Sequence, residues 1–69
     1  MTSTLKIECV GGLWDARILD ITTDEFGRLP SVLLDDGGKP FYSLLFDECR
    51  ILAGNRHEYL GARYVPAAA

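Results

Sequence analysis

The chain has 69 residues, of which 48% are hydrophobic and 25% are charged, and its formal net charge is −3 with a pI near 4.8. This composition excludes an intrinsically disordered chain and predicts one small domain with a limited core. An acidic balance counts against binding a phosphate backbone, so a nucleic-acid partner is not expected. Neither a signal peptide nor a run of roughly 18 apolar residues is visible, so we expect a cytoplasmic protein.

The first third of the chain predicts two strands. Residues 4–10 alternate apolar and polar side chains, which is the period of a half-buried strand. Gly11-Gly12 then predicts a turn. Residues 13–21 predict a second strand, in which the apolar phase slips after Ile18 and indicates a bulge or bend.

The middle of the chain predicts a hairpin. The DDGG stretch at 35–38 separates the apolar runs 31–34 and 41–45. Asp-Gly and Gly-Gly pairs tolerate the positive φ angles of tight hairpin turns, so this stretch is interpreted as a chain reversal. The polar residues 22–28 predict a loop, and Pro30 predicts the start of a strand.

The C-terminal part leaves alternatives open. Residues 46–49 predict a single helical turn, followed by a short strand at 50–52. Alternatively, one helix runs from 43 to 53 and ends at Gly54. Residues 56–65 predict a last strand, and 66–69 predict a loose tail. The expected architecture is mainly β, with about five strands and one short helical turn in a single domain, 1–69.

Few residues suggest catalytic or metal chemistry. Cys9 and Cys49 are too few for a disulfide framework and lack zinc-ligand spacing, so we predict two reduced thiols acting as small core residues. His57 and Glu58 are sequence neighbours, which point to opposite faces of a strand and form no dyad. The DDGG stretch lacks the ligand spacing of a calcium loop. We therefore expect no catalytic residues, no metal and no cofactor.

The runs LWDARILDI, SVLLDDGGKPFYSLL and CRIL together resemble the Tudor branch of the SH3-like barrels. The resemblance covers residues 5–52 and implies a small SH3/Tudor-like β-barrel. It leaves 53–69 as a C-terminal strand or tail.

The resemblance also implies recognition of methylated lysine or arginine in an aromatic cage. Trp14 matches the first cage position, but Asp36 stands where the family has an aromatic residue. Phe41 or Tyr42 would replace that aromatic, with Asp35 or Asp36 as the carboxylate partner of the cation.

A core this small predicts self-association. The apolar C-terminal side chains have few expected partners within one chain, so we expect a homo-oligomer that buries them. The candidate interface residues are Tyr59, Leu60, Tyr64 and Val65.

Three functions are consistent with these patterns. The first is a small non-catalytic interaction module that binds a protein or peptide. The second is a homo-oligomeric ligand-binding protein or enzyme with a pocket at the subunit junction. The third is an acidic inhibitor or nucleic-acid mimic from a phage or mobile element, suggested by the three basic and seven acidic side chains of residues 1–38, a net charge of −4.

Overall fold

Seven strands and one short helical turn make up the part of the chain, residues 2–67, that the computed structural model describes. The mainly β architecture with one short helical turn is confirmed. The elements in chain order are β1 (Thr4–Cys9), β2 (Ile18–Thr22), β3 (Val32–Leu34), β4 (Pro40–Leu45), β5 (Glu48–Leu52), the 3-10 helix η1 (Ala53–Asn55), β6 (Arg56–Leu60) and β7 (Arg63–Pro66).

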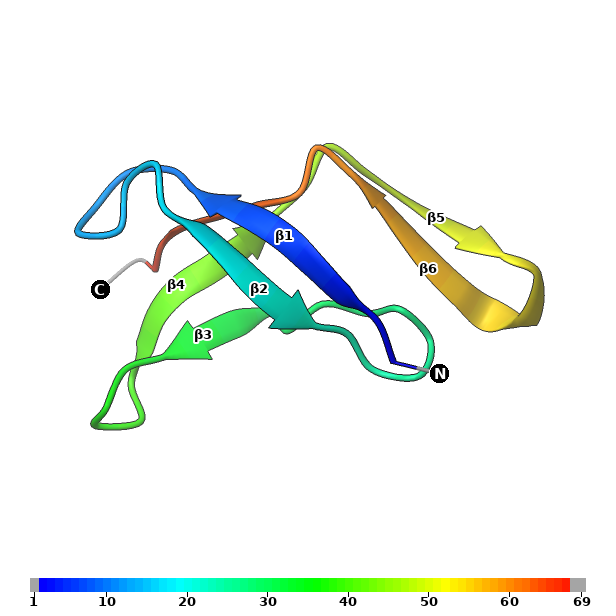
Figure 1. Ribbon diagram of the computed structural model, residues 1–69, viewed down its shortest axis with the longest axis horizontal. Helices are drawn as coiled ribbons and strands as arrows, with labels where there is room; N and C mark the ends of the chain where they lie inside the picture. The colour runs from blue at the N-terminus through cyan, green and yellow to red at the C-terminus, as the bar shows by residue number, and fades with distance from the viewer. Residues whose placement is uncertain (1, 68–69) are drawn as a thin grey trace.

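Five of the strands form a main sheet in the order β2-β1-β7-β4-β3, which curls into a half-barrel (Figure 1). Strand β7 runs parallel to β1 and antiparallel to β4, so it joins the β1–β2 and β3–β4 hairpins. The segment 53–69, expected to lie outside the barrel, therefore contributes the central strand of the sheet.

The first predicted strand is confirmed, and the second begins later than expected. Residues 13–16 form a turn, and β2 starts at Ile18. These residues cannot continue an extended strand, because Gly11, Gly12 and Ala16 have positive φ angles of 87°, 72° and 66°. The slip in apolar phase after Ile18 marks the start of a strand rather than a bulge within one.

The DDGG stretch is the predicted reversal between β3 and β4. One carboxylate oxygen of Asp35, Oδ1, accepts hydrogen bonds from the backbone N–H groups of Gly37 and Lys39, each at 2.9 Å. An aspartate that binds the backbone two residues on is typical of turns. The alternative helix over 43–53 is wrong, because both β4 and β5 are strands there.

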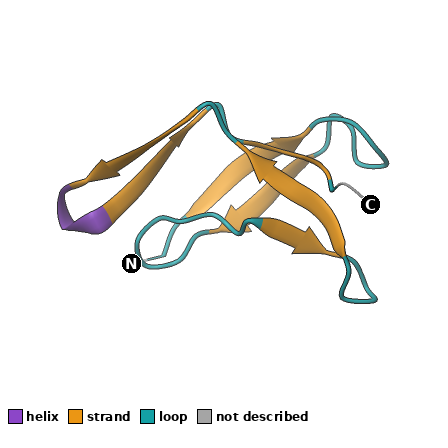
Figure 2. Ribbon diagram, turned by 180° about the vertical axis from the view of Figure 1, so that it is seen from behind, coloured by secondary structure: helices purple, strands orange, loops and turns teal. Residues whose placement is uncertain are grey.

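The strands β5 and β6 form a separate hairpin that projects from the half-barrel (Figures 1 and 2). The helical turn predicted at 46–49 is wrong, since helical geometry occurs instead at the tip of this hairpin, in η1. The predicted strand 56–65 is broken at Gly61, where φ is 69° and the Asp47 side chain fills the space that a Cβ would need. No helix within residues 2–67 is long and apolar enough to cross a membrane.

The predicted loose tail, 66–69, is ordered at its start. Pro66 ends β7, and the N–H of Ala67 donates to the carbonyl of Phe41 at 3.0 Å. Residues 68–69 lie outside the described residues.

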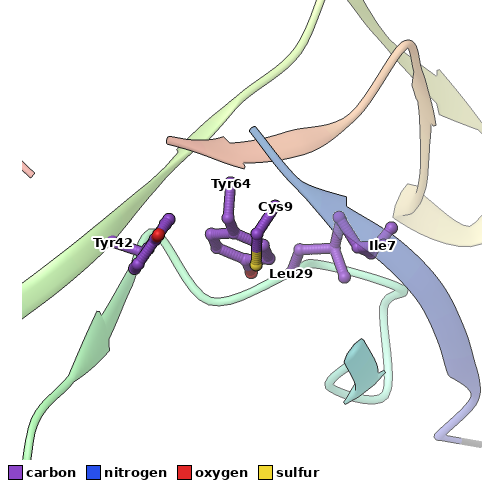
Figure 3. Packing of buried hydrophobic residues seen from close by; sticks show 5 residues of the cluster. All are labelled: Ile7, Cys9, Leu29, Tyr42 and Tyr64. Atoms are coloured by element: carbon purple, nitrogen blue, oxygen red, sulfur yellow. The ribbon is translucent and has the colours of Figure 1, made fainter. Parts of the chain in front are cut away.

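The core lies inside the curl of the main sheet, where Figure 3 shows its five buried side chains. They are Ile7, Cys9, Leu29, Tyr42 and Tyr64. Cys9 and Cys49 are both free, as predicted, but Cys49 is half-buried on β5 and does not belong to the core, so its predicted role as a core residue is wrong. Burial raises the pKa of the Cys9 thiol. Both buried tyrosines use their hydroxyls; that of Tyr64 donates to the carbonyl of Pro30 at 2.8 Å.

Tyr64 makes the stability of the fold sensitive to alkali. Burial, with smaller contributions from Tyr59 and Cys9, raises the pKa of Tyr64 to about 12, above the value near 10 of an unfolded chain. Because the native state keeps a proton that the unfolded state releases, this stabilisation is complete below about pH 10 and is lost as the pH rises through about 12. We expect urea unfolding to show a loss of about 2 kcal/mol over that range. The slope should be shallower in Tyr64→Phe; an equal slope in both proteins would contradict the assignment.

Candidate functional site

Three of the predicted site residues meet at one end of the main sheet. The indole of Trp14 stacks on Tyr42 with 5.4 Å between ring centroids and 12° between planes. The Phe41 ring lies edge-on to both, with centroids 4.9 Å from Trp14 and 4.8 Å from Tyr42. Tyr42 is buried, whereas Trp14 and Phe41 are half-buried. These three residues are called the aromatic cluster below.

The rings of the aromatic cluster contact one another directly. A methylated ammonium held between parallel rings would separate them by about 7–8 Å, twice the usual carbon contact distance. Trp14 and Tyr42 are closer than that. The guanidinium of Arg17 lies over Trp14, 5.5 Å from the ring centroid, so the cation on the indole is supplied by the chain itself.

The loop 10–17, which carries Trp14, is held by a network of hydrogen bonds. The Tyr42 hydroxyl accepts from the Trp14 backbone N–H at 2.8 Å and donates to the Gly11 carbonyl at 2.7 Å. The Asp15 carboxylate accepts from the Gly11 N–H at 2.7 Å. The Ala16 N–H donates to the Cys9 carbonyl at 2.8 Å. These contacts fix the loop to both β1 and β4.

The tip of this loop exposes a large apolar side chain. Leu13 is 84% exposed, more than any other large hydrophobic residue among those described. Ala16 has a positive φ, which is uncommon for a residue other than glycine and is found repeatedly at functional sites. A strained, firmly held loop that presents Leu13 to solvent is the most distinctive surface feature of the molecule.

The two predicted acidic residues do not join the aromatic cluster by any hydrogen bond found in residues 2–67. Asp35 satisfies the backbone of its own turn, and Asp36 is exposed beside it. Their positions follow from the hairpin rather than from a binding site.

The predicted interface residues separate into two groups. Tyr64 is fully buried in the core of its own chain, so it does not reach a second copy. Val65 follows Tyr64 in β7, so its side chain points to the opposite face of the sheet, where it is half-buried. Tyr59 and Leu60 lie on the projecting hairpin, where Leu60 is 37% exposed and the Tyr59 ring packs edge-on against Phe46.

His57 is held by its own neighbourhood. Its backbone N–H donates to the Phe26 carbonyl at 2.7 Å, and its ring Nδ1 lies 3.1 Å from the Asn55 carbonyl. Within residues 2–67, no group of three histidine, cysteine or acidic side chains is placed to hold a metal ion. The carboxylate of Asp24 accepts hydrogen bonds from the backbone N–H groups of Arg28 and Phe26. The backbone hydrogen bond from Arg28 contributes most to lowering the pKa of this carboxyl.

Two open grooves are lined in part by the segment between β2 and β3. One, of about 510 Å³, is lined by residues 22–24 and 28–31. The other, of about 480 Å³, lies between the half-barrel and the β5–β6 hairpin. Its lining includes Leu5, Thr23, Leu52, Arg56 and His57. Neither groove contains residues of the aromatic cluster.

Sequence patterns found the aromatic cluster and missed Leu13 and Arg17. Residues 13–17 fit a strand by alternation, which hid the loop. The signal that points to a loop is the Gly11-Gly12 pair, which supplies two successive positive φ angles.

Close packing at Gly12 is expected to be essential for the loop. A Cβ at Gly12 would lie 2.7 Å from Pro66 Cγ and 2.8 Å from the Tyr42 hydroxyl oxygen, whereas Gly38 has a similar φ and open space. Both Gly12→Ala and Gly38→Ala incur about 1 kcal/mol of backbone strain, and only the first adds a steric clash. Chemical denaturation should show a clearly larger loss for Gly12→Ala. Equal losses would contradict this packing.

The Tyr42 hydroxyl is expected to control the order of the loop. Tyr42→Phe leaves the Trp14 N–H and the Gly11 carbonyl without their partner, which costs about 1–3 kcal/mol. Amide hydrogen exchange at Trp14 should accelerate in this variant. It should be unchanged in the control Tyr59→Phe, which alters a ring of the projecting hairpin.

Comparison with known proteins assigns no family to this site. No protein-family model, no curated protein and no solved structure matches the chain.

Proposed function

We propose that the chain is a non-catalytic interaction module that binds a protein or peptide through loop 10–17 and the aromatic cluster. The observation that carries the proposal is the exposure of Leu13 on a loop whose backbone is tied down by Tyr42 and Asp15. Binding residues are often found on loops that a rigid scaffold positions.

The restrained backbone favours binding energetically. A partner that buries Leu13 removes a full leucine side chain from water, which contributes about 1.5–3 kcal/mol. Because hydrogen bonds already fix loop 10–17, little further conformational entropy is lost on binding. Trp14, which follows Leu13 in the loop, and Phe41, whose ring packs edge-on against Trp14, are half-buried, so both are partly accessible to a partner.

The chemistry of the site favours an apolar anchor with basic flanks. Arg17 already occupies a position over the Trp14 ring, so a partner's cation would compete with it there. Residues 1–38 carry a net charge of −4, which favours approach of a basic segment. The proposed ligand is therefore a peptide with an aliphatic or aromatic side chain next to lysine or arginine.

The distribution of titratable groups supports a non-catalytic role. The described groups with shifted pKa values are Cys9, Asp24 and Tyr64. Cys9 and Tyr64 belong to the core, and Asp24 caps its own loop. A poised acid–base pair in a cleft is the usual sign of catalysis, and these three do not form one.

A second candidate function rests on the groove between the body and the hairpin. Its volume of about 480 Å³ suits a small ligand, and its lining combines Leu5 and Leu52 with the polar Arg56 and His57. A homo-oligomer that brings another copy against this groove would enclose it. Binding of small molecules at Leu52 and His57, with no effect at Leu13, would favour this alternative.

Two exposed leucines give a matched test of the interaction module. Peptides selected from a random displayed library against the whole chain are expected to shift the NMR signals of Leu13, Trp14 and Phe41. Leu13→Ser should abolish their binding, whereas Leu34→Ser, which changes a leucine that is 58% exposed on β3, should not. Both substitutions are at the surface, so each should change stability by less than about 0.5 kcal/mol. Selected peptides that bind both variants equally would refute the proposed site.

A further inference from the structure

The outer edge of β5 is an open strand edge. In the hairpin, Ile51 faces His57 and Cys49 faces Tyr59. The His57 N–H donates to Phe26 and so points away from β5. Ile51 and His57 therefore form a non-hydrogen-bonded pair of the antiparallel ladder. In such a pair the N–H and C=O groups of both residues point away from the partner strand. Ile51 therefore presents its backbone groups away from β6, and so, two residues earlier, does Cys49.

These outward groups have no backbone partner within residues 2–67. Strand β6 is covered on its own outer side at His57 by the loop around Phe26, but β5 has no comparable cover. Cys49 and Ile51, the two residues with outward backbone groups, have apolar side chains, and Ile51 is 68% exposed. A two-stranded hairpin is also marginally stable alone, and further strands stabilise it.

The other two open edges are less suited to self-pairing. Strand β3 has only three residues and an irregular register between Leu33 and Leu34, which interrupts its outward groups. On β2 the middle outward residue is Asp20, so antiparallel pairing of two copies about it would bring two short carboxylates together. Among the described residues, each of these carboxylates has one ion-pair partner, Lys6 at 3.0 Å, whereas Arg50 on β5 has two.

We propose that two copies of the chain associate edge to edge through β5, antiparallel about a two-fold axis at Arg50. This register places Cys49 of one copy opposite Ile51 of the other. It uses the outward N–H and C=O groups of both residues in each copy and forms four intermolecular backbone hydrogen bonds. The product is a four-stranded sheet built from two hairpins. The interface is distinct from loop 10–17.

The charge distribution favours a second copy at this place. Residues 46–63 carry three acidic side chains and three arginines, a net charge of zero, while residues 1–38 carry −4. Association through the hairpins therefore avoids bringing the acidic parts together. Each Arg50 lies 3.2 Å from Glu48 and 3.9 Å from Glu58, so the two arginines on the axis are compensated within their own chains. The partner's Glu48 lies diagonally across and within reach of a long side chain.

The association is expected to be weak, because pairing two short edges buries less than the roughly 1,200 Å² of a standard protein interface. Sedimentation velocity from low micromolar to near-millimolar protein should show a monomer that converts to a dimer. Over the same range, amide exchange should slow at Cys49 and Ile51 and stay constant at Arg50, which already faces β6. A monomer throughout, or protection appearing at β2 instead, would overturn the proposal.

Cysteine cross-linking tests the register. Residues opposite each other in a hydrogen-bonded antiparallel pair have Cα atoms about 5.5 Å apart, within the range of a disulfide. Oxidation of Ile51→Cys should therefore give a covalent dimer through Cys49. The matched variant Leu52→Cys changes the next exposed apolar residue, which this register sets opposite Glu48, and should stay monomeric.

Two further controls make the cross-link specific. The natural chain should not cross-link, because its two Cys49 residues lie diagonally, about 7–8 Å apart. The double variant Cys49→Ser, Ile51→Cys should lose the link as well. Equal cross-linking of the Ile51→Cys and Leu52→Cys variants would overturn the register. These outcomes are independent of peptide binding at Leu13, so failure of one proposal is distinguishable from failure of the other.

Discussion

The position of β7 between β1 and β4 holds the main sheet together. Within residues 2–67 the hairpins β1–β2 and β3–β4 do not pair directly, and β7 joins them by pairing with both. Strand β7 also carries Tyr64, whose buried ring fills the core and whose hydroxyl ties the carbonyl of Pro30 to it. The sheet is therefore complete only when segments from opposite ends of the chain meet, and such non-local pairing is a slow step in β folding.

The candidate site depends on the same strand. Pro66, the last residue of β7, pairs with Tyr42, and its ring occupies the space that a side chain at Gly12 would need. Tyr42 in turn holds the loop through its hydroxyl. The positive φ of Ala16 costs about 1–2 kcal/mol in an isolated chain, and the hydrogen bonds of the loop offset it. The exposed position of Leu13 is thus a consequence of how the sheet closes.

Local patterns predicted the features that local physics decides. The alternation of residues 4–10 and the turn chemistry at Asp35 act within a few residues, and both features are confirmed. The predicted start of β2 is wrong because the true start depends on a hydrogen bond from the Trp14 backbone N–H to the hydroxyl of Tyr42, 28 residues away. The break at Gly61 depends similarly on Asp47, which no short window contains. Trp14, Phe41 and Tyr42 were found as aromatic residues, but their direct stacking is a tertiary property.

The two proposed surfaces lie at opposite ends of a molecule 36 Å long: the loop between β1 and β2 at one end and the β5–β6 hairpin at the other (Figures 1 and 2). Pairing through β5 would therefore leave both loops free and directed away from the axis. A partner with one binding segment would gain nothing from such a dimer. A partner with two segments on a linker long enough to span both loops would bind the second at a raised effective concentration. Weak self-association and peptide binding would then reinforce each other, since each doubly bound partner also holds the two copies together.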